Sequence, residues 1–295
     1  MEDKSFRPKL PPWIRVRVSC GAVSEKVDSL VKGLALNTVC QGAQCPNQGE
    51  CWGRGTAAFM ILGNRCTRNC KFCAVGHVEK PLPPDPDEPE NLARAAAQMN
   101  LKYVVVTCVT RDDLPDGGAS HFAATTAALK RLVPGIKVEI LTSDFNGVER
   151  DIATSMEGVD VYNHNLETVE RMTPLVRTRA EYRKSLQVLA TAARLADGKI
   201  PVKSGIMVGL GETDSEVEQT ILDLREAGVS LLTIGQYLQP SSEHWKLDRF
   251  VTPEQFAAWA KFAKDIGFTH VASGPLVRSS YHADLLAAGK EDAVS

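Results

Sequence analysis

The amino-acid sequence predicts an α/β fold, a partial (β/α) barrel of about six parallel strands. Two observations carry this prediction. Short apolar runs alternate with helical patterns along most of the chain, and a repeated strand-then-helix order implies a parallel sheet. No Gly-x-Gly-x-x-Gly fingerprint accompanies the runs, which favours a barrel over a dinucleotide-binding sheet. In such barrels the loops that follow the strands build the active site.

The chain is expected to have three parts. Residues 1–56 form an N-terminal extension rich in cysteine, residues 57–272 form the barrel core, and residues 273–295 form a C-terminal tail that closes the barrel mouth. Within the extension, alternating apolar and charged residues at 13–18 predict a strand, and apolar residues at helical spacing over 24–36 predict a short amphipathic helix.

The barrel core contains seven apolar runs that are typical of strands. They lie at residues 59–62, 103–109, 137–141, 158–162, 202–208, 231–237 and, more weakly, 268–272. Helical patterns lie between them, at residues 91–99, 121–132, 181–195, 216–227 and 253–266. The core therefore reads as six or seven strand-helix units without a second domain.

Local motifs mark some of the helix ends. Capping boxes are predicted from Thr213 to Glu216 and from Thr252 to Gln255, the second with proline at the first helical position. The connector at 77–89 is rich in proline, and we expect an extended, non-helical surface segment there.

Composition restricts the class of protein. The chain has 295 residues, 43% of them hydrophobic, with a net charge of −2, which is typical of a soluble globular protein without a basic face for nucleic acid. The longest apolar runs are shorter than the roughly 18–20 residues of a membrane helix. The N-terminus resembles neither a secretory signal nor a transit peptide, so we expect a cytoplasmic location and no membrane partner.

Six of the eight cysteines fall between Cys40 and Cys73. Because cytosolic thiols stay reduced, this clustering indicates metal ligation rather than disulfides. The two others, Cys20 and Cys108, lie outside the cluster, and we expect them to be buried structural thiols.

Cys66, Cys70 and Cys73 form a C-x3-C-x2-C triplet in the loop after the first barrel strand. Three thiolates at this spacing can bind three irons of a cubane cluster and leave the fourth iron open to a ligand. The alternative is a zinc site completed by His77. Cys40, Cys45 and Cys51 form a second triplet with a spacing that fits no common zinc module, and structural zinc or buried thiols remain open for it.

Several motifs together resemble one family. The C-x3-C-x2-C triplet with an aromatic at Phe72 is similar to the signature of radical S-adenosyl-L-methionine (AdoMet) enzymes. The string from Cys40 to Trp52, Arg-Asp-Asp-Leu-Pro-Asp-Gly-Gly at 111–118, Tyr-Asn-His-Asn-Leu-Glu at 162–167 and Arg-Ser-Ser-Tyr-His-Ala at 278–283 resemble the lipoyl synthase family. The resemblance covers nearly the whole chain.

The resemblance implies two 4Fe-4S clusters and AdoMet as cofactors. Cys66, Cys70 and Cys73 would hold the cluster that cleaves AdoMet, and Cys40, Cys45 and Cys51 would hold an auxiliary cluster. The fourth ligand of the auxiliary cluster would be Ser280, with Ser279 as second choice; a hard alkoxide binds such a cluster weakly, which suits a cluster that is dismantled. Side chains expected near AdoMet are Phe72, Asn163, Met207 and Gln236, with the strand-end positions of His164, Asn165 and Tyr237 as further contacts.

The reaction implied is the insertion of two sulfur atoms at C6 and C8 of a protein-bound octanoyl chain, with sulfur drawn from the auxiliary cluster. It proceeds through a 5'-deoxyadenosyl radical, and no side chain acts as a general acid or base. Implied partners are an octanoylated lipoyl carrier domain or H-protein, an electron donor such as flavodoxin or ferredoxin, and a carrier that rebuilds the cluster. The alternatives are another two-cluster radical AdoMet enzyme and a non-catalytic, zinc-stabilised module.

One acidic motif suggests catalytic carboxylates but receives another interpretation. Asp112, Asp113 and Asp116 lie in a loop with two glycines, and such loops commonly cap the following helix. We therefore assign them no acid-base role.

Overall fold

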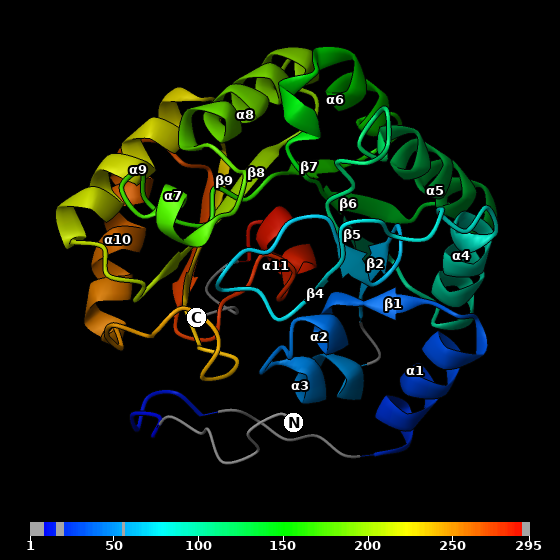
Figure 1. Ribbon diagram of the computed structural model, residues 1–295, viewed down its shortest axis with the longest axis horizontal. Coiled ribbons are helices and arrows are strands. Elements are labelled where there is room, and N and C mark those ends of the chain that lie inside the picture. Colours follow the sequence, from blue (N-terminus) through cyan, green and yellow to red (C-terminus); the bar gives the residue numbers. More distant parts are fainter. Residues whose placement is uncertain (1–8, 16–20, 55–56, 291–295) are drawn as a thin grey trace.

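The structure is a computed structural model that describes residues 9–15, 21–54 and 57–290. Its main sheet has eight strands in the order β1-β2-β5-β6-β7-β8-β9-β10, and all neighbours from β2 to β10 are parallel. The sheet curves through an arc with helices on its outer side (Figure 1). Its strands are β1 (Asn37–Thr38), β2 (Ala58–Ile61), β5 (Tyr103–Cys108), β6 (Lys137–Leu141), β7 (Val161–Asn163), β8 (Val202–Val208), β9 (Leu231–Gln236) and β10 (His270–Gly274).

The parallel part of the sheet confirms the predicted partial barrel. Each of the seven apolar runs corresponds to one parallel strand, with small differences at the ends. The largest difference is at β7, which begins at Val161 because Gly158 adopts a left-handed turn conformation with φ 73°. The antiparallel edge strand β1 was not predicted, since two residues carry no readable alternation.

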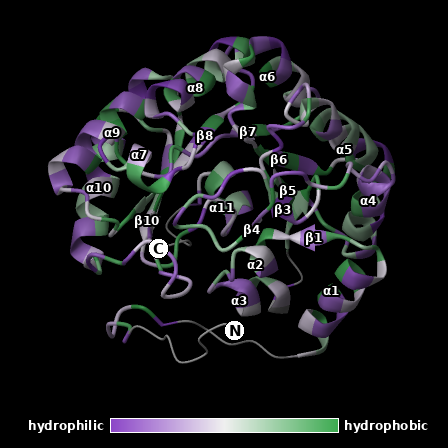
Figure 2. Ribbon diagram, in the orientation of Figure 1, coloured by the Kyte–Doolittle hydropathy of each residue, from purple (hydrophilic) through white to green (hydrophobic). Residues whose placement is uncertain are grey.

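Helices cover the outer face of the sheet, and their ribbons alternate between hydrophilic and hydrophobic colours, as expected for helices with one apolar face (Figure 2). All predicted helices are present: α1 (Ala22–Gly33), α4 (Glu88–Gln98), α5 (Ala119–Leu132), α8 (Tyr182–Ala196), α9 (Asp214–Glu226) and α10 (Pro253–Asp265). Shorter ones were not predicted: α2 (Val39–Gly42), α3 (Gln48–Gly53), the 3-10 turn η1 (Phe145–Gly147), α6 (Glu149–Ser155), α7 (Thr173–Val176) and α11 (Ala283–Ala287).

Of the two predicted capping boxes, one is confirmed fully and the other partly. Thr213 and Glu216 form a reciprocal capping box at α9, while at α10 Thr252 accepts the hydrogen bond from the backbone N–H of Gln255. The expectation that the connector is non-helical through Pro89 is wrong at its end, because α4 begins at Glu88. Proline is tolerated in the first helical turn, where its missing N–H would have no partner.

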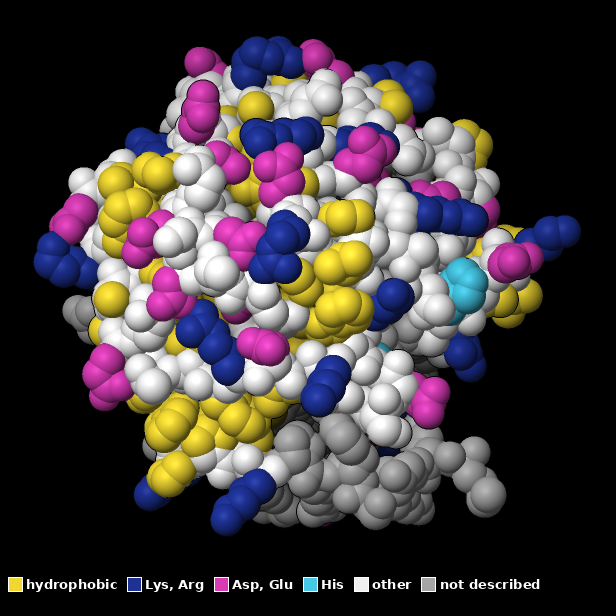
Figure 3. Space-filling view, turned by 60° about the vertical axis from the view of Figure 1, so that its left-hand side comes forward, with side chains coloured by type: hydrophobic (Ala, Val, Ile, Leu, Met, Phe, Trp, Pro, Cys, Tyr) yellow, Lys and Arg dark blue, Asp and Glu magenta, His cyan; other side chains and the backbone are white. Residues whose placement is uncertain are grey.

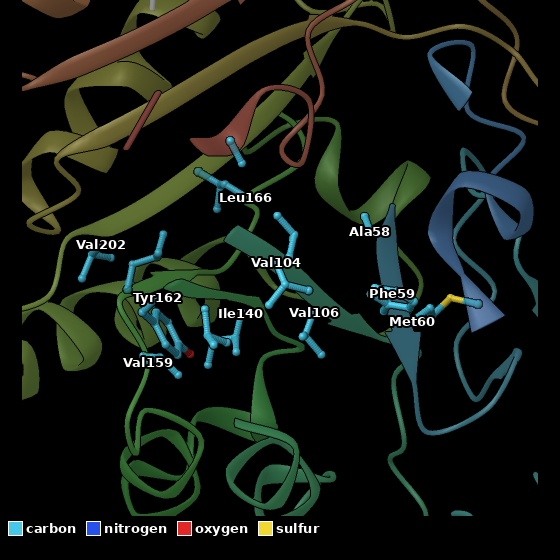
Figure 4. Close-up of a cluster of buried hydrophobic side chains, with 14 of the residues drawn as sticks. Ala58, Phe59, Met60, Val104, Val106, Ile140, Val159, Tyr162, Leu166 and Val202 are labelled. Atoms are coloured by element: carbon cyan, nitrogen blue, oxygen red, sulfur yellow. The ribbon is translucent and has the colours of Figure 1, made fainter. Parts of the chain in front are cut away.

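The extension shares one hydrophobic core with the barrel. Buried Val27, Val31 and Trp52 belong to the same cluster as the side chains of the central strands. Figure 4 shows part of this cluster, with Phe59 of β2 and Ile140 of β6 among its labelled side chains. The division at residues 56 and 272 stays a prediction, and β1 ties the extension to the sheet by pairing with β2.

The strand predicted near the N-terminus is not found in the described residues. Residues 13–15 are not in a strand, and the rest of the stretch predicted at 13–18 lies outside the described residues, as does Cys20.

On the face in Figure 3, acidic and basic side chains are interspersed among apolar ones. Among the helices of the described ranges, none has both the length and the apolar character needed to cross a bilayer.

Candidate active site

A cavity of about 500 Å³ lies at the carboxyl ends of the strands and brings most of the predicted site residues together. This volume is within the range of roughly 300–1,000 Å³ that is common for small-molecule sites. The predicted ligand residues that line it are Cys40, Cys45, Cys66, Cys70, Cys73 and Ser280. Cys51 is not among the lining residues; it lies in α3, where the charges of Cys40 and Cys45 reach it. Segments from both ends of the chain and from the barrel therefore share one cavity.

The loop of the first triplet is closed at its base by two short strands. β3 (Arg65–Cys66) pairs in parallel with β4 (Gly76–His77). The two ends of the loop that carries the cysteines therefore lie side by side. Backbone hydrogen bonds hold the loop from outside: Thr67 N donates to Thr110 O at 3.1 Å, Lys71 N to Val176 O at 2.9 Å, and Trp245 N to Lys71 O at 2.7 Å. Three separate segments of the barrel thus fix this loop.

Arg68, which lies between the first two cysteines of this loop, anchors it to the ends of β5 and β6. Its buried guanidinium pairs with Asp112 at 2.7 Å and with Asp144 at 2.6 Å. Burial opposes the ionisation of Asp144, but the hydrogen bonds and the charge of Arg68 outweigh it and lower the pKa of Asp144 to about 2. The ion pair between Arg68 and Asp144 is therefore intact at neutral pH.

The other two aspartates of the acidic loop also have structural partners. Asp116 accepts hydrogen bonds from Gly118 N at 2.9 Å and Ser120 N at 2.8 Å, which confirms that it caps α5. Asp113 pairs with Arg111 at 2.8 Å. None of the three carboxylates needs an acid-base role.

The thiols of the first triplet lie close enough to one another for their charges to interact. The pKa of Cys73 is raised to about 12, mainly by burial and also by the charges of the neighbouring Cys70 and Cys66. Burial also raises the pKa of Cys70, and the nearby charge of Arg177 opposes this rise. A buried arginine beside the thiols suits a metal cluster with anionic ligands, because it offsets their negative charge.

The zinc alternative for this triplet depended on His77 as the fourth ligand. His77 is exposed and its Nδ1 lies 3.2 Å from the backbone oxygen of Cys66. Among the described residues, no three His, Cys, Asp or Glu side chains form a group suited to a single metal ion. In a cubane each thiolate binds a different iron, so the thiols can be spread over a wider space.

The second triplet lies on two short helices of the extension. Cys40 is in α2, Cys51 is in α3, and Cys45 is in the turn between them. The pKa of Cys51 is raised to about 12, mainly by burial and also by the charges of Cys40 and Cys45, so these thiols also form a group. Arg278 of the tail is close enough to Cys45 to feel its charge, although burial lowers the pKa of this arginine. Each triplet therefore has an arginine nearby.

The C-terminal tail lies between the second triplet and the barrel. Asn47 Nδ2 donates to Leu276 O at 2.7 Å, Tyr281 OH donates to Glu50 Oε1 at 3.0 Å, and Arg54 Nη1 lies 2.7 Å from Nδ1 of His282. These bonds connect the tail to the helices that carry the cysteines.

A glycine on β9 gives the tail room. A Cβ placed on Gly235 would lie 2.2 Å from the backbone oxygen of Val277, so a larger residue would push the tail away. The expected closing of the barrel mouth by the tail therefore depends on glycine at this position.

The two serines of the tail differ in their contacts. Ser279 Oγ donates to Asn165 Oδ1 at 2.8 Å, and Ser279 O accepts a bond from Lys203 at 2.7 Å. Ser280 also lines the cavity, and its hydroxyl has no hydrogen bond to the described part of the chain. Ser280 is thus the serine with an uncommitted oxygen.

The side chains expected near AdoMet fall into two groups. Phe72 and Met207 line the cavity. Gln236 also borders it, but its amide is committed to Val208, Tyr237 and Arg249 carbonyls and to Val251 N. Asn163 is not among the lining residues, because it is buried in β7 and donates to Glu139 at 3.2 Å. Gln236 and Asn163 therefore support the wall, while the first two face the cavity.

His164 and Asn165, the next residues after β7, do line the cavity. Burial, together with the charge of Arg177, lowers the pKa of His164 to about 4, so its ring is neutral at pH 7. Its Nδ1 lies 3.0 Å from Thr142 O, and its buried Nε2 has no hydrogen-bond partner among the described residues. Since Nδ1 is the donor in that contact, Nε2 offers a lone pair for a ligand.

Sequence reasoning missed several residues of the wall and misjudged another. The buried residue Arg177 and the half-buried Glu167 line the cavity, and neither lies in a motif with readable chemistry beyond the resemblance. Cys108 is half-buried at the cavity wall rather than fully buried, since it is the last residue of β5 and the strand ends there open into the cavity. The position of Arg68 between Cys66 and Cys70 is visible in the sequence and could have indicated an arginine that anchors this loop.

The fold and the site define a class of enzyme. Residues 60–224 match the family model of the radical SAM superfamily. The solved structure of methylornithine synthase shares the fold, with a TM-score of 0.56 and 11% identity, over 85% of this chain and 78% of that chain. A FeFe-hydrogenase maturase from Carboxydothermus hydrogenoformans also shares it, with a TM-score of 0.59 and 13% identity, over 92% of this chain and 68% of that chain. The chain is a radical AdoMet enzyme, and iron-sulfur and AdoMet cofactors follow from this class.

Within this superfamily the chain belongs to the lipoyl synthase family. It is 54% identical to the lipoyl synthase of Caldanaerobacter subterraneus subsp. tengcongensis over 93% of this chain and 96% of the relative, and 54% identical to that of Myxococcus xanthus over 92% of each. It is also 51% identical to a chloroplastic lipoyl synthase of Zea mays, over 93% of this chain and 80% of the relative. The expected family, fold and enzyme class are confirmed, and the alternative of a non-catalytic, zinc-stabilised module is rejected because the relatives are enzymes.

Proposed function

We propose that the chain forms lipoyl groups with two clusters, one at each cysteine triplet, inside the cavity described above. The observation that carries this proposal is that the first triplet, two cysteines of the second triplet, Ser280 and the strand ends border one cavity. A substrate carbon in that cavity can lie near both metal sites without leaving the protein. The chain belongs to a family whose name states the product, which supports the same reaction here.

Cys66, Cys70 and Cys73 are the proposed ligands of the first cluster. When bound, this group and AdoMet supply a radical strong enough to remove hydrogen from an unactivated methylene, which no side chain can do. The protein's part is to hold the loop rigid through Arg68 and the backbone bonds described above and to keep water out. The buried thiols become ligands only after deprotonation, so their raised pKa values predict proton release on metal binding.

Cys40, Cys45 and Cys51 are the proposed ligands of the auxiliary cluster, and Ser280 is the proposed fourth ligand. The uncommitted hydroxyl of Ser280 on the cavity wall supports this choice over Ser279, whose hydroxyl is bonded to Asn165. A serine oxygen is a hard ligand and binds iron in a sulfide cluster less firmly than a thiolate does. Weak binding by Ser280 allows the site to open when sulfur is removed.

AdoMet is proposed to lie between the first triplet and the ends of β7 and β8. Phe72 and Met207 offer apolar surface there, and Asn165 and His164 offer polar atoms. The Nε2 of the neutral His164 ring, which has no partner in the described part of the chain, suits a hydroxyl or ammonium donor of the cofactor. Asn163 and Gln236 are proposed to support these residues from behind rather than to touch AdoMet.

The family implies an octanoylated lipoyl domain as substrate. Apolar side chains form much of the cavity wall, which suits an acyl chain; they include Met60, Val105, Leu141, Ile206 and Val277. An H-protein as a second carrier, flavodoxin or ferredoxin as electron donor, a carrier that rebuilds the auxiliary cluster, and a cytoplasmic location are proposals that follow from the family resemblance.

The test is an anaerobic incubation of the purified chain with AdoMet, a reductant and an octanoylated peptide of a lipoyl domain, followed by mass spectrometry. We expect two sulfur atoms in the acyl chain and 5'-deoxyadenosine as co-product. Iron and sulfide are measured in the same preparation. A preparation that is loaded with both clusters, cleaves AdoMet and leaves the octanoyl chain unchanged would contradict the proposal.

A further inference from the structure

A buried ion pair inside the barrel has no role in the function described so far. Lys203 of β8 and Glu139 of β6 have side chains that are 1% and 0% exposed, and Nζ lies 2.8 Å from Oε1. The two strands flank β7, and Lys203 is in register with Asn163 on that strand. Burying two charges is costly, so such a pair in a core calls for a specific reason.

The partners of this pair point to the C-terminal tail. Glu139 of β6 also accepts hydrogen bonds from Tyr103 OH of β5 at 2.6 Å and from Asn163 Nδ2 of β7 at 3.2 Å. With Lys203 of β8, three neighbouring strands therefore donate to this one carboxylate. Lys203 Nζ has a second acceptor, the backbone oxygen of Ser279, at 2.7 Å. The ammonium group therefore connects the rigid sheet to a residue 76 positions further along the chain.

We propose that Lys203 is a positioning residue that sets the orientation of Ser280 by holding the backbone carbonyl of Ser279. This inference rests on the proposed role of Ser280 as cluster ligand. The carbonyl of Ser279 and the Cα of Ser280 belong to one planar peptide unit, so fixing that oxygen limits where the Ser280 side chain can point. A charged donor makes a stronger bond to this carbonyl than a neutral one would.

The side chain of Ser279 supplies a second fixed point for the same peptide. Its hydroxyl donates to Asn165 Oδ1 at 2.8 Å, beside Gly205 of β8. A Cβ on Gly205 would lie 2.8 Å from Ser279 Oγ and 2.9 Å from Asn165 Oδ1, so glycine leaves room for this contact. The adjacent serines thus divide the work: Ser279 attaches the tail to the barrel, and Ser280 keeps its oxygen for iron.

The test compares amide hydrogen exchange of tail residues 275–283 in the cluster-loaded enzyme. The variant is Lys203→Met with Glu139→Gln, which removes the tie to Ser279 without leaving an unpaired buried charge. Tyr103→Phe is the matched control, because it removes one hydrogen bond to Glu139 and none to the tail. We expect exchange of the tail to rise about tenfold or more in the double variant and to stay at the wild-type rate in Tyr103→Phe.

A second readout reports on the cluster. Mössbauer spectra are recorded for the double variant, and we expect the iron with an oxygen ligand in the wild-type enzyme to lose that signature. If the double variant does not fold, Lys203→Leu with Glu139→Gln, which also leaves no unpaired buried charge and no donor for Ser279 O, is measured with the same expectation. Wild-type exchange rates in the tail of the variant would overturn the proposal.

Ser280→Ala separates this proposal from the one on which it rests. If the spectrum changes in Ser280→Ala but not in the Lys203 variant, the positioning role is wrong and the ligand assignment stands. If neither variant changes the spectrum, Ser280 is not the ligand, and the positioning role falls with it.

Discussion

The two cysteine triplets are held by different parts of the molecule. The loop of Cys66, Cys70 and Cys73 is fixed by backbone hydrogen bonds from three barrel segments and by the buried ion pairs of Arg68. The triplet from Cys40 to Cys51 lies on short helices whose links to the tail are side-chain hydrogen bonds, from Asn47, Glu50 and Arg54. One triplet belongs to the barrel, and the other belongs to a contact between the two ends of the chain.

This difference matches what each site is proposed to do. A cluster used in every turnover needs ligands that do not move, and a loop anchored in the core provides them. A cluster that gives up its sulfur must be opened and rebuilt, and side-chain hydrogen bonds between the tail and the short helices open at lower free-energy cost than the backbone bonds and buried ion pairs of the barrel loop. On this proposal, the stable site lies on the sheet and the consumable site lies where the chain ends meet.

The largest expected effect follows from removing the barrel triplet. With Cys66, Cys70 and Cys73 replaced by Ala, we expect no AdoMet cleavage, because the electron has no path to the cofactor. Production of 5'-deoxyadenosine is measured by chromatography after reduction. Cleavage at the wild-type rate in this variant would show that the chemistry takes place elsewhere.

Removing the other triplet should break only half of the reaction. With Cys40, Cys45 and Cys51 replaced by Ala, we expect about half of the iron and sulfide, continued AdoMet cleavage, and no sulfur in the acyl chain. The measurement is mass spectrometry of the octanoylated peptide together with 5'-deoxyadenosine. Sulfur insertion by this variant would mean that the auxiliary cluster is not the sulfur source.

The anchoring of the barrel loop can be tested through its buried arginine. Arg68→Met leaves Asp144 buried without its partner, and we expect a loss of about 3–5 kcal/mol in the free energy of unfolding. Arg194→Met, which removes the exposed ion pair with Glu149, is the control and should change stability little. Denaturant unfolding measures both. Equal stability of the two variants would show that Arg68 does not anchor the loop.

A smaller effect concerns pH and His164 on the cavity wall. Its pKa is lowered to about 4 by burial and by Arg177, so below pH 6.5 the unfolded chain binds a proton that the folded chain does not. Stability should therefore fall as pH drops, by about 2 kcal/mol between pH 7 and pH 5 from this group. We expect His164→Gln to lose this part of the pH dependence in denaturant unfolding of the metal-free chain. An unchanged slope would contradict it.

The barrel was predictable because its strands and long helices repeat with a clear period. The apolar runs at residues 202–208 and 231–237, for example, became β8 and β9 within one residue. Short elements such as α3 and α11 could not be found, because they are stabilised by contacts between distant parts of the chain rather than by their own pattern. The same holds for β1, which exists only through its pairing with β2.

The site was predictable where residue type alone limits the chemistry. Cysteine spacing identified six ligand candidates, since few other functions need three thiols so close together. The supporting charges were not predictable: Lys203 and Glu139 lie in strands read as apolar, and their positions differ by 64 residues. Arg68 and Asp144 are 76 residues apart. Nothing local in the sequence indicates which distant charge will be the partner.

The central claim is that Ser280 completes a weakly held auxiliary site, and the yield of lipoyl product per auxiliary cluster tests it most directly. The yield is compared among the wild type, Ser280→Ala, Ser280→Cys and Ser279→Ala. We expect little or no product and a labile cluster with Ala at 280, and a retained cluster with impaired turnover with Cys, because a thiolate binds iron more tightly than an alkoxide. Full yield in Ser280→Ala would contradict the account, and loss confined to Ser279→Ala would move the ligand one residue upstream.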